Sequence, residues 1–177
     1  MKRLQMIAKF AISVILGLML VLPGEIAIAL NSSANDQQPA LSGNGQYLAY
    51  VSNRNGHRQI VLYDLQRQEL VDLPGLNHGD AIAENPSLSN TGRYLVYMAS
   101  DSGRPEIELY DRKTSHVQIV SGGYRGWIRH PRISPDGRYI IFETGRRGQW
   151  DLEVLDRGSH IELDRVDRVE NKDKTQE

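Results

Sequence analysis

The histidines of this 177-residue chain are the side chains best suited to metal binding or proton transfer, and their spacing supports neither role. The five lie at positions 57, 78, 116, 130 and 160. None forms the His-Glu-x-x-His pattern that presents two ligands on one helix face. His57, His116 and His160 fall between predicted strands, where a solvated side chain is the ordinary condition. We therefore assign no metal ligand.

A nucleophile with its supporting groups is also missing. The chain contains no cysteine, which excludes a thiolate site, a disulfide and a lipid-modified cysteine. No Gly-x-Ser-x-Gly elbow occurs, and the turns 53–56 and 101–103 lack the terminal glutamate of a calcium loop. We expect no catalytic residues, no cofactor and no enzymatic activity from this sequence.

Partner binding is the better supported class, because one glycine-rich loop, Ser121–His130, carries aromatic and basic side chains that often anchor interfaces. The candidates are Tyr124, Arg125, Trp127, Arg129 and His130 of this loop, Arg146 and Arg147 of a later turn, and Asn85, which ends the corresponding loop 74–85. They would present a basic, aromatic surface to an acidic protein or an anionic envelope polymer. The alternative is that Trp127 fills a gap between repeats and the arginines are merely solvated. Trp150 is expected in the core or in blade packing.

The elements that must position these residues come from an internal repeat. Three segments begin at Pro39, Pro86 and Pro131, and their Pro, Ser, Gly and Asp landmarks recur at offsets of 47 and then 45 residues. Each has a Ser-x-x-Gly turn, an aromatic and β-branched run, a second turn, and an alternating strand that ends at Asp. A fourth strand is expected around residues 70–73, 117–120 and 161–163. Four antiparallel strands per 45 residues or so predict β-propeller blades.

The predicted fold is therefore all-β, with three consecutive four-stranded antiparallel blades after an N-terminal signal peptide. We divide the chain into a signal peptide (1–29), a polar spacer (30–38), the propeller repeats (39–164) and a charged, disordered tail (165–177). The blades are expected at about 39–73, 86–120 and 131–164.

The repeat unit reads Pro-x-[Leu/Ile]-Ser-x-x-Gly-[Gln/Arg]-Tyr-[Leu/Ile]-x-[Tyr/Phe] and closes on a hydrophobic strand and Asp. It resembles the WD-repeat-like blade of the TolB family, periplasmic propellers of the Tol-Pal envelope system, over residues 39 to about 164. The resemblance implies a propeller that docks protein partners, including the peptidoglycan-associated lipoprotein, around its central channel. The chain departs from TolB because it lacks the separate α/β domain before the blades and has three blades where TolB has six.

Three blades cannot close a ring, since closed propellers need about four to eight. An open stack leaves an apolar blade face at each end. Two copies related by a two-fold axis would supply six blades and cover both faces, and a different propeller fragment would also serve. The third arrangement is an open wedge capped by its own tail, for which the charged tail is poorly suited.

The N-terminal segment resembles a cleaved export signal. Basic residues precede the thirteen residues Phe10–Leu22, which are apolar apart from Ser13 and Gly17, and Ala27-Ile28-Ala29 offers a cleavage site before Leu30. Thirteen helical residues span about 20 Å, short of the roughly 30 Å hydrocarbon core, so we expect no stable membrane anchor after cleavage. We expect a periplasmic or secreted protein. The net charge of -1 gives no reason to expect a nucleic-acid partner.

Together these features predict an exported, non-catalytic binding or scaffold module of the cell envelope. Its expected partner is an envelope protein, such as a Tol-Pal-like lipoprotein. The alternatives are a glycan-binding or small-ligand-binding protein, or a hydrolase whose site forms only between subunits.

Overall fold

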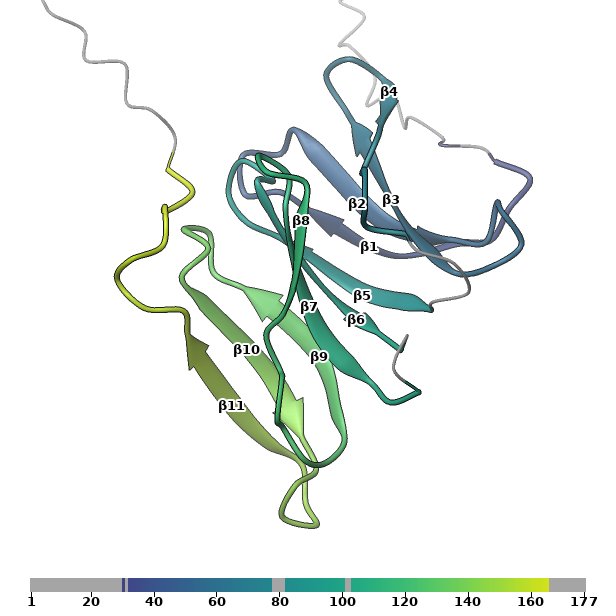
Figure 1. Ribbon diagram of the computed structural model, residues 1–177. Coiled ribbons are helices and arrows are strands. Elements are labelled where there is room, and N and C mark those ends of the chain that lie inside the picture. The colour runs from purple at the N-terminus through teal and green to yellow at the C-terminus, as the bar shows by residue number, and fades with distance from the viewer. Residues whose placement is uncertain (1–29, 31, 78–81, 101–102, 166–177) are drawn as a thin grey trace, which may run out of the picture. The chain divides into compact units, whose positions relative to one another are not determined.

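The computed structural model describes residues 30, 32–77, 82–100 and 103–165, and it divides the chain into two units, Met1–Asn31 and Ser32–Glu177. The signal peptide expected at 1–29 and nearly all of the tail expected at 165–177 lie outside the described residues. In the described part of the second unit, all regular secondary structure is β-strand (Figure 1). No helix among these residues is long and apolar enough to cross a membrane.

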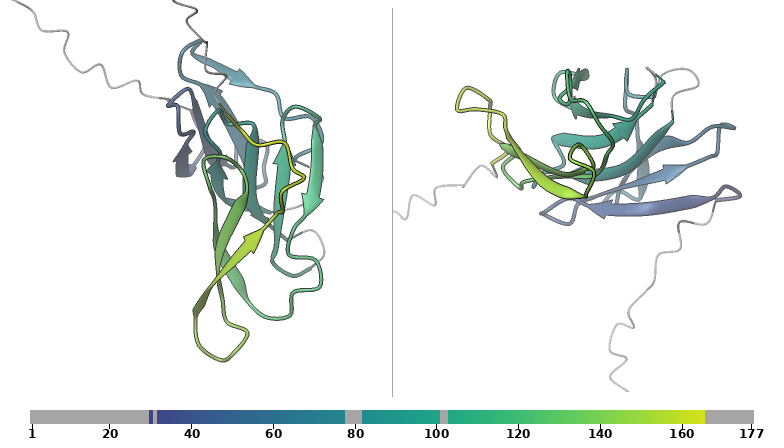
Figure 2. Two further views of the ribbon diagram at one scale, coloured as in Figure 1. Left: turned by 90° about the vertical axis from the view of Figure 1, so that its left-hand side faces the viewer. Right: turned by 90° about the horizontal axis from the view of Figure 1, so that it is seen from below.

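The strands of the described residues form three antiparallel sheets, which match the three repeats (Figures 1 and 2). The first contains β1 (Asp36–Leu41), β2 (Tyr47–Ser52), β3 (Gln59–Asp64) and β4 (Glu69–Val71). The second contains β5 (Ala83–Leu88), β6 (Tyr94–Ala99), β7 (Glu106–Asp111) and β8 (His116–Ile119). The third contains β9 (Ile128–Ile133), β10 (Tyr139–Thr144) and β11 (Asp151–Asp156). In each sheet the strands pair in chain order, so the predicted all-β blades are confirmed.

The Ser-x-x-Gly-x-Tyr motif of each repeat is a hydrogen-bonded turn between the first two strands. The serine hydroxyl oxygen accepts the amide of the tyrosine five residues later, at 2.9 Å in all three blades. The glycine has a left-handed backbone in each turn, with φ of 72° at Gly45, 71° at Gly92 and 79° at Gly137. These values explain why the glycine recurs, since a side chain there would be strained.

The aspartate that ends each third strand is tied to the residue after that glycine. Two blades use a two-pronged arginine contact, and the first uses an amide, in the pairs Gln46–Asp64, Arg93–Asp111 and Arg138–Asp156. Because the two partners are 18 residues apart in every blade, this contact fixes the length of the hairpin.

The middle blade packs against both of its neighbours. Its Leu95, Tyr97 and Tyr110 join Val51 and Leu62 of the first blade in one buried cluster. The opposite face of the middle blade carries Tyr94, Val96, Met98, Ile107 and Leu109, which join Ile128, Ile133, Ile140 and Phe142 of the third blade in a second cluster. The core therefore lies between the blades.

The innermost strand of each blade begins three residues before its proline. β1, β5 and β9 begin at Asp36, Ala83 and Ile128, so β1 lies partly within the expected polar spacer. A register shift interrupts the pairing of each of these strands with its neighbour. The residue before each proline is left-handed there, with φ of 52–54° at Gln38, Asn85 and His130. This bulge lets pairing continue on both sides of a residue that cannot donate a backbone hydrogen bond.

The expectation of a fourth strand at residues 161–163 is wrong, because the third sheet contains three strands. The chain leaves β11 and returns to the middle blade instead. The Tyr94 hydroxyl donates to the carbonyl of Glu162, and the buried Asp164 carboxylate accepts the hydroxyls of Ser89 and Thr91. These polar contacts are available only to a segment that turns away from β11.

Candidate partner-binding site

The loop before β9 and the turn after β10 meet at one end of the third blade. The Gly145 amide donates to the Trp127 carbonyl at 2.8 Å. A methyl group on Gly145 would lie 3.6 Å from Cβ of Trp127 and 3.8 Å from the ring of Trp150. The glycine therefore lies between the two indole side chains, which are the only tryptophans of the chain.

Arg129 connects the Trp150 indole to a carboxylate. Its guanidinium lies over the Trp150 ring, 3.7 Å from the centroid, and its Nε donates to Glu143 Oε2 at 2.6 Å. His130 Nδ1 lies 3.1 Å from the other Glu143 oxygen. The hydrogen bond from Arg129, and next that from His130, holds the pKa of Glu143 below its ordinary value. Glu143 thus stays ionised and fixes the arginine over the ring.

Both indoles are open to solvent, with 69% of Trp127 and 49% of Trp150 exposed. The expectation that Trp150 lies in the core is therefore wrong. The repeat itself carried the signal, because Trp150 aligns with Arg58 and Pro105, which immediately precede the corresponding strands of the other blades. A position before the strand lies at the end of the blade, where side chains meet solvent.

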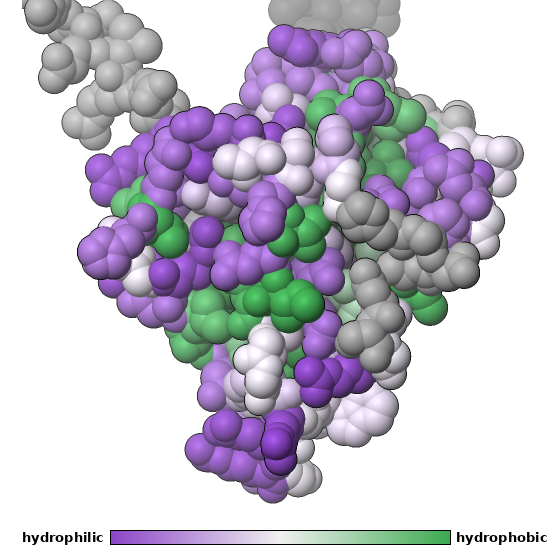
Figure 3. Space-filling view, viewed as in Figure 1, coloured by the Kyte–Doolittle hydropathy of each residue, from purple (hydrophilic) through white to green (hydrophobic). Residues whose placement is uncertain are grey.

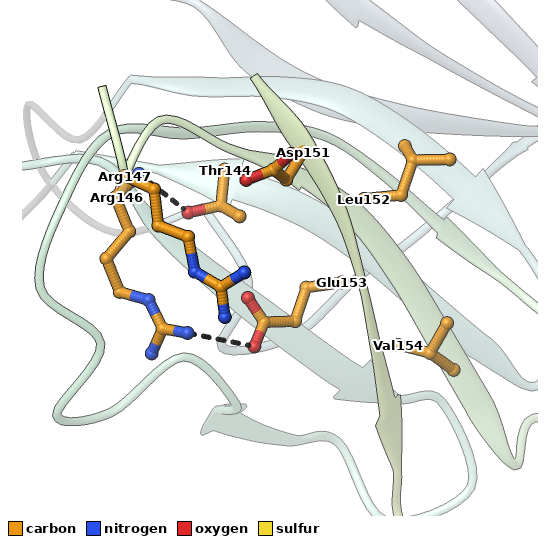
Figure 4. A pocket seen from close by; sticks show the side chains of 7 residues that line it. All are labelled: Thr144, Arg146, Arg147, Asp151, Leu152, Glu153 and Val154. Carbon is orange, nitrogen blue, oxygen red and sulfur yellow. Dashed lines mark hydrogen bonds and ion pairs between the residues drawn. The ribbon is translucent and has the colours of Figure 1, made fainter. Parts of the chain in front are cut away.

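Two further arginines extend the charged surface. Arg146 lies over the partly buried Tyr124 ring, 5.3 Å from its centroid, and its Nη2 lies 3.7 Å from Glu153. Figure 4 shows Arg146 and Arg147 beside a pocket along β11, with Glu153 and Asp151 on the opposite side. Arg125 and Arg147 are exposed, and neither forms a salt bridge within the described ranges.

Of the predicted site residues, Trp127, Arg129 and His130 lie together, and Tyr124 and Arg146 form a neighbouring pair. The Tyr124 ring stands edge-on to the core residue Phe142, at 5.3 Å between centroids. Asn85 shares with Arg129 a groove between the second and third blades. The backbone N–H of Asn85 donates to Gln38 Oε1 at 2.7 Å.

We define the Trp–Arg patch as Trp127, Arg129, Arg146 and Trp150. Two exposed indoles, one of them stacked with a guanidinium group, suit contact with an aromatic or acidic partner surface. Beside them, Arg129 and His130 pair with Glu143, and Arg146 lies 3.7 Å from Glu153. Among the described residues, no three His, Asp or Glu side chains are placed to hold a metal ion.

No protein-family model matches the chain, and no curated protein matches it either. Solved structures do. TolB from Acinetobacter baumannii is similar with a TM-score of 0.60 and 28% sequence identity, over 73% of this chain and 32% of that one. A TolB-type protein from Agrobacterium tumefaciens gives 0.56 and 20%, over 75% and 49%. A puromycin-hydrolysing peptidase of Mycobacterium tuberculosis gives 0.53 and 15%, over 70% and 19%, which shows the fold alone.

These likenesses define the class of protein as a β-propeller built from consecutive antiparallel blades. Within that class the chain is a partial propeller of the TolB-like type, as the repeat motif predicted. It spans about a third and about half of the TolB chains that it matches.

Proposed function

We propose that this protein is an exported, non-catalytic binding module of the cell envelope that docks a protein partner through the Trp–Arg patch. The observation that carries the proposal is the exposure of both tryptophans, one of them held under Arg129. Large aromatic side chains are costly to leave in water, and interface hot spots are enriched in Trp, Tyr and Arg. Covering such a surface with a partner lowers the free energy of the system and so favours binding.

The TolB likeness supports an envelope protein as that partner. The peptidoglycan-associated lipoprotein implied by the sequence resemblance is the first partner to test. The likeness covers only part of the TolB chains, so the partner belongs to the proposal.

Export is the second element of the proposal. It rests on the basic and apolar residues 1–29, which lie outside the described residues. N-terminal sequencing of the protein recovered from an osmotic-shock fraction should begin at Leu30. Recovery of an intact N-terminus from the cytoplasm would overturn export without touching the binding surface.

The binding surface is tested by calorimetric titration of the protein with the soluble part of the peptidoglycan-associated lipoprotein. We expect Trp127→Ala and Arg146→Ala each to weaken binding about tenfold or more, as hot-spot truncations do. Arg67→Ala is the matched control, because Arg67 is an exposed arginine of the first blade, outside the patch.

Binding that survives both patch substitutions would overturn the assignment of the surface. Absence of lipoprotein binding would overturn the proposed partner. Saturable binding of soluble peptidoglycan fragments instead, lost in Trp127→Ala, would favour the glycan-binding alternative.

A further inference from the structure

The third blade turns one face away from the middle blade, and part of that face is apolar. By the alternation of β10 and β11 it carries Tyr139, Ile141, Leu152 and Val154. Their exposed fractions are 37%, 41%, 76% and 59%. We name these four residues the receiving face.

The same positions in the middle blade show what such a face is built to do. Tyr94, Val96, Ile107 and Leu109 correspond to them 45 residues earlier, and each is at most 3% exposed. They are buried because the third blade packs on them. The receiving face therefore has the residue types of an internal blade contact, but among the described residues no further sheet packs on it.

The first blade presents the opposite half of such a contact. The residues by which the middle blade docks on the first include Leu88, Leu95 and Tyr110. Their counterparts 47 residues earlier are Leu41, Leu48 and Tyr63. Leu41 is 60% exposed, and Leu70 of the outer strand of the same blade is 53% exposed. We name Leu41, Leu48, Tyr63 and Leu70 the docking face.

Details of the internal contacts agree with this pairing. In the contact between blades two and three, Arg157 lies over the Tyr94 ring. Gly137 leaves room for that ring, since a methyl group on Gly137 would lie 2.4 Å from it. In the contact between blades one and two, Arg112 lies over the Tyr47 ring and Gly92 leaves room for it.

The corresponding residues on the docking face are Gly45 and Leu65. Gly45 has no atom within 4 Å of where a methyl group would be. Tyr139 on the receiving face lies under Arg138 of its own blade, 5.1 Å from the ring centroid. Among the described residues it lacks the glycine and the arginine of a following blade that cover Tyr47 and Tyr94. An apolar Leu65 in place of arginine suits the Tyr139 ring.

We propose that a second copy of this chain covers both faces, with the receiving face of each copy packed on the docking face of the other. Figure 1 shows the β1–β4 and β9–β11 sheets on opposite sides of the middle sheet, so one copy cannot join its own two faces. Two copies supply six blades, within the about four to eight that close a ring, whereas three copies would supply nine. A head-to-tail contact made twice closes with two-fold symmetry.

The test is the solution mass of the protein purified from the osmotic-shock fraction, by sedimentation velocity across protein concentrations. We expect a mass of two chains. Leu152→Arg on the receiving face and Leu41→Arg on the docking face should each halve it, and both side chains are exposed enough that the fold is kept. Gly45→Asn should act likewise, because asparagine tolerates the left-handed backbone but would meet Tyr139 of the second copy. Ile119→Arg, on an exposed residue of β8, is the control that should remain a dimer.

Mixing the two arginine variants distinguishes a head-to-tail contact from a symmetric patch. A mixed pair retains one intact contact, so association should partly return, whereas a patch that pairs with itself would stay broken. A wild-type mass of one chain, or growth into open polymers, would overturn the proposal. Lipoprotein binding is measured separately, by titration of the Trp–Arg patch variants.

Discussion

The carboxylate of Asp164 accepts hydrogen bonds from both the backbone amide and the side-chain hydroxyl of Thr91, at 2.8 and 2.5 Å. In the third blade the residue that corresponds to Thr91 is Asp136, whose own carboxylate accepts the Ser134 hydroxyl. Thr91 has no carboxylate, and Asp164 supplies one from 73 residues further along the chain. The segment after β11 therefore completes a turn of the middle blade.

Substitution of Asp164 should destabilise the fold. We expect Asp164→Ala to lower the free energy of unfolding by about 1–3 kcal/mol, because it leaves the Ser89 and Thr91 groups without their charged acceptor. Urea denaturation measures the change. In the Asp164→Ala background, Thr91→Asp should recover part of the loss by restoring the arrangement of the third blade. Asp72→Ala, at an exposed residue, is the control and should have little effect. If Thr91→Asp recovers no stability, the inference that Asp164 takes the place of a carboxylate at position 91 is contradicted.

The repeated glycines should differ in their tolerance of a methyl group. Gly45 and Gly137 have similar backbone angles, so alanine strains both by roughly 1–2 kcal/mol. At Gly137 the methyl group would also meet the buried Tyr94 ring, which should add about 1–3 kcal/mol. Urea denaturation in a Leu152→Arg background, where we expect single chains, compares the two. Equal costs would show that Tyr94 moves aside freely.

Equivalent residues on covered and open blade faces should differ in their effect on stability. Ile107 is fully buried and Leu152 is 76% exposed at the same position of the repeat. Ile107→Ala should cost about 2–5 kcal/mol through lost packing and a cavity. Leu152→Ala should stay within about 0.5 kcal/mol for the single chain. Thermal denaturation in dilute solution measures both, and a large cost at Leu152 there would place that side chain in a contact within the chain.

Removal of Arg129 should uncover the Trp150 ring. In a Trp127→Phe background Trp150 is the sole tryptophan, so its quenching by acrylamide reports on this ring alone. Arg129→Ala should raise the quenching constant, while stability should fall by no more than about 1 kcal/mol, as for exposed cation–π pairs. Arg147→Ala is the control, since no ring contact of Arg147 occurs in the described part of the chain. Equal quenching in both variants would contradict the stacking.

Stability should fall in acid through carboxylates held by arginine and lysine. Hydrogen bonds from Arg138, and then from the Gly158 amide, lower the pKa of Asp156 from 3.8 to about 2. Hydrogen bonds from Lys113 and then Arg93 lower the pKa of Glu162 below its ordinary 4.5. The unfolded chain therefore binds more protons in this range, so the stabilisation is present above about pH 4.5 and is lost as the pH falls toward 2.

A thermal melting series from pH 7 to 2 checks this expectation. The melting temperature should fall once the pH is lowered below 4.5. Arg138→Gln should flatten the plot of melting temperature against pH at its acidic end, because it removes the partner that lowers the pKa of Asp156. A melting temperature that stays constant down to pH 2 would contradict these pKa shifts.

The sequence by itself determined the blades. Its landmarks act over short distances, with serine five residues from its tyrosine partner and aspartate 18 residues from its arginine or glutamine partner. Such contacts recur at a fixed spacing and can therefore be recognised in one chain. The repeat also predicts the loop that carries Trp127 and Arg129, because this loop leads into the first strand of the third blade.

Only the tertiary structure decided which side chains meet across the repeats. Residues 161–163 have the apolar pattern of a fourth strand, but Asp164 draws the segment to Thr91, a partner that no local pattern reveals. Trp150 has the composition of a core residue, but its place before β11 puts it under Arg129 at the solvent-exposed end of the blade. Tyr94 and Tyr139 occupy the same position of the repeat, and only the packing of the next blade makes one buried and leaves the other exposed.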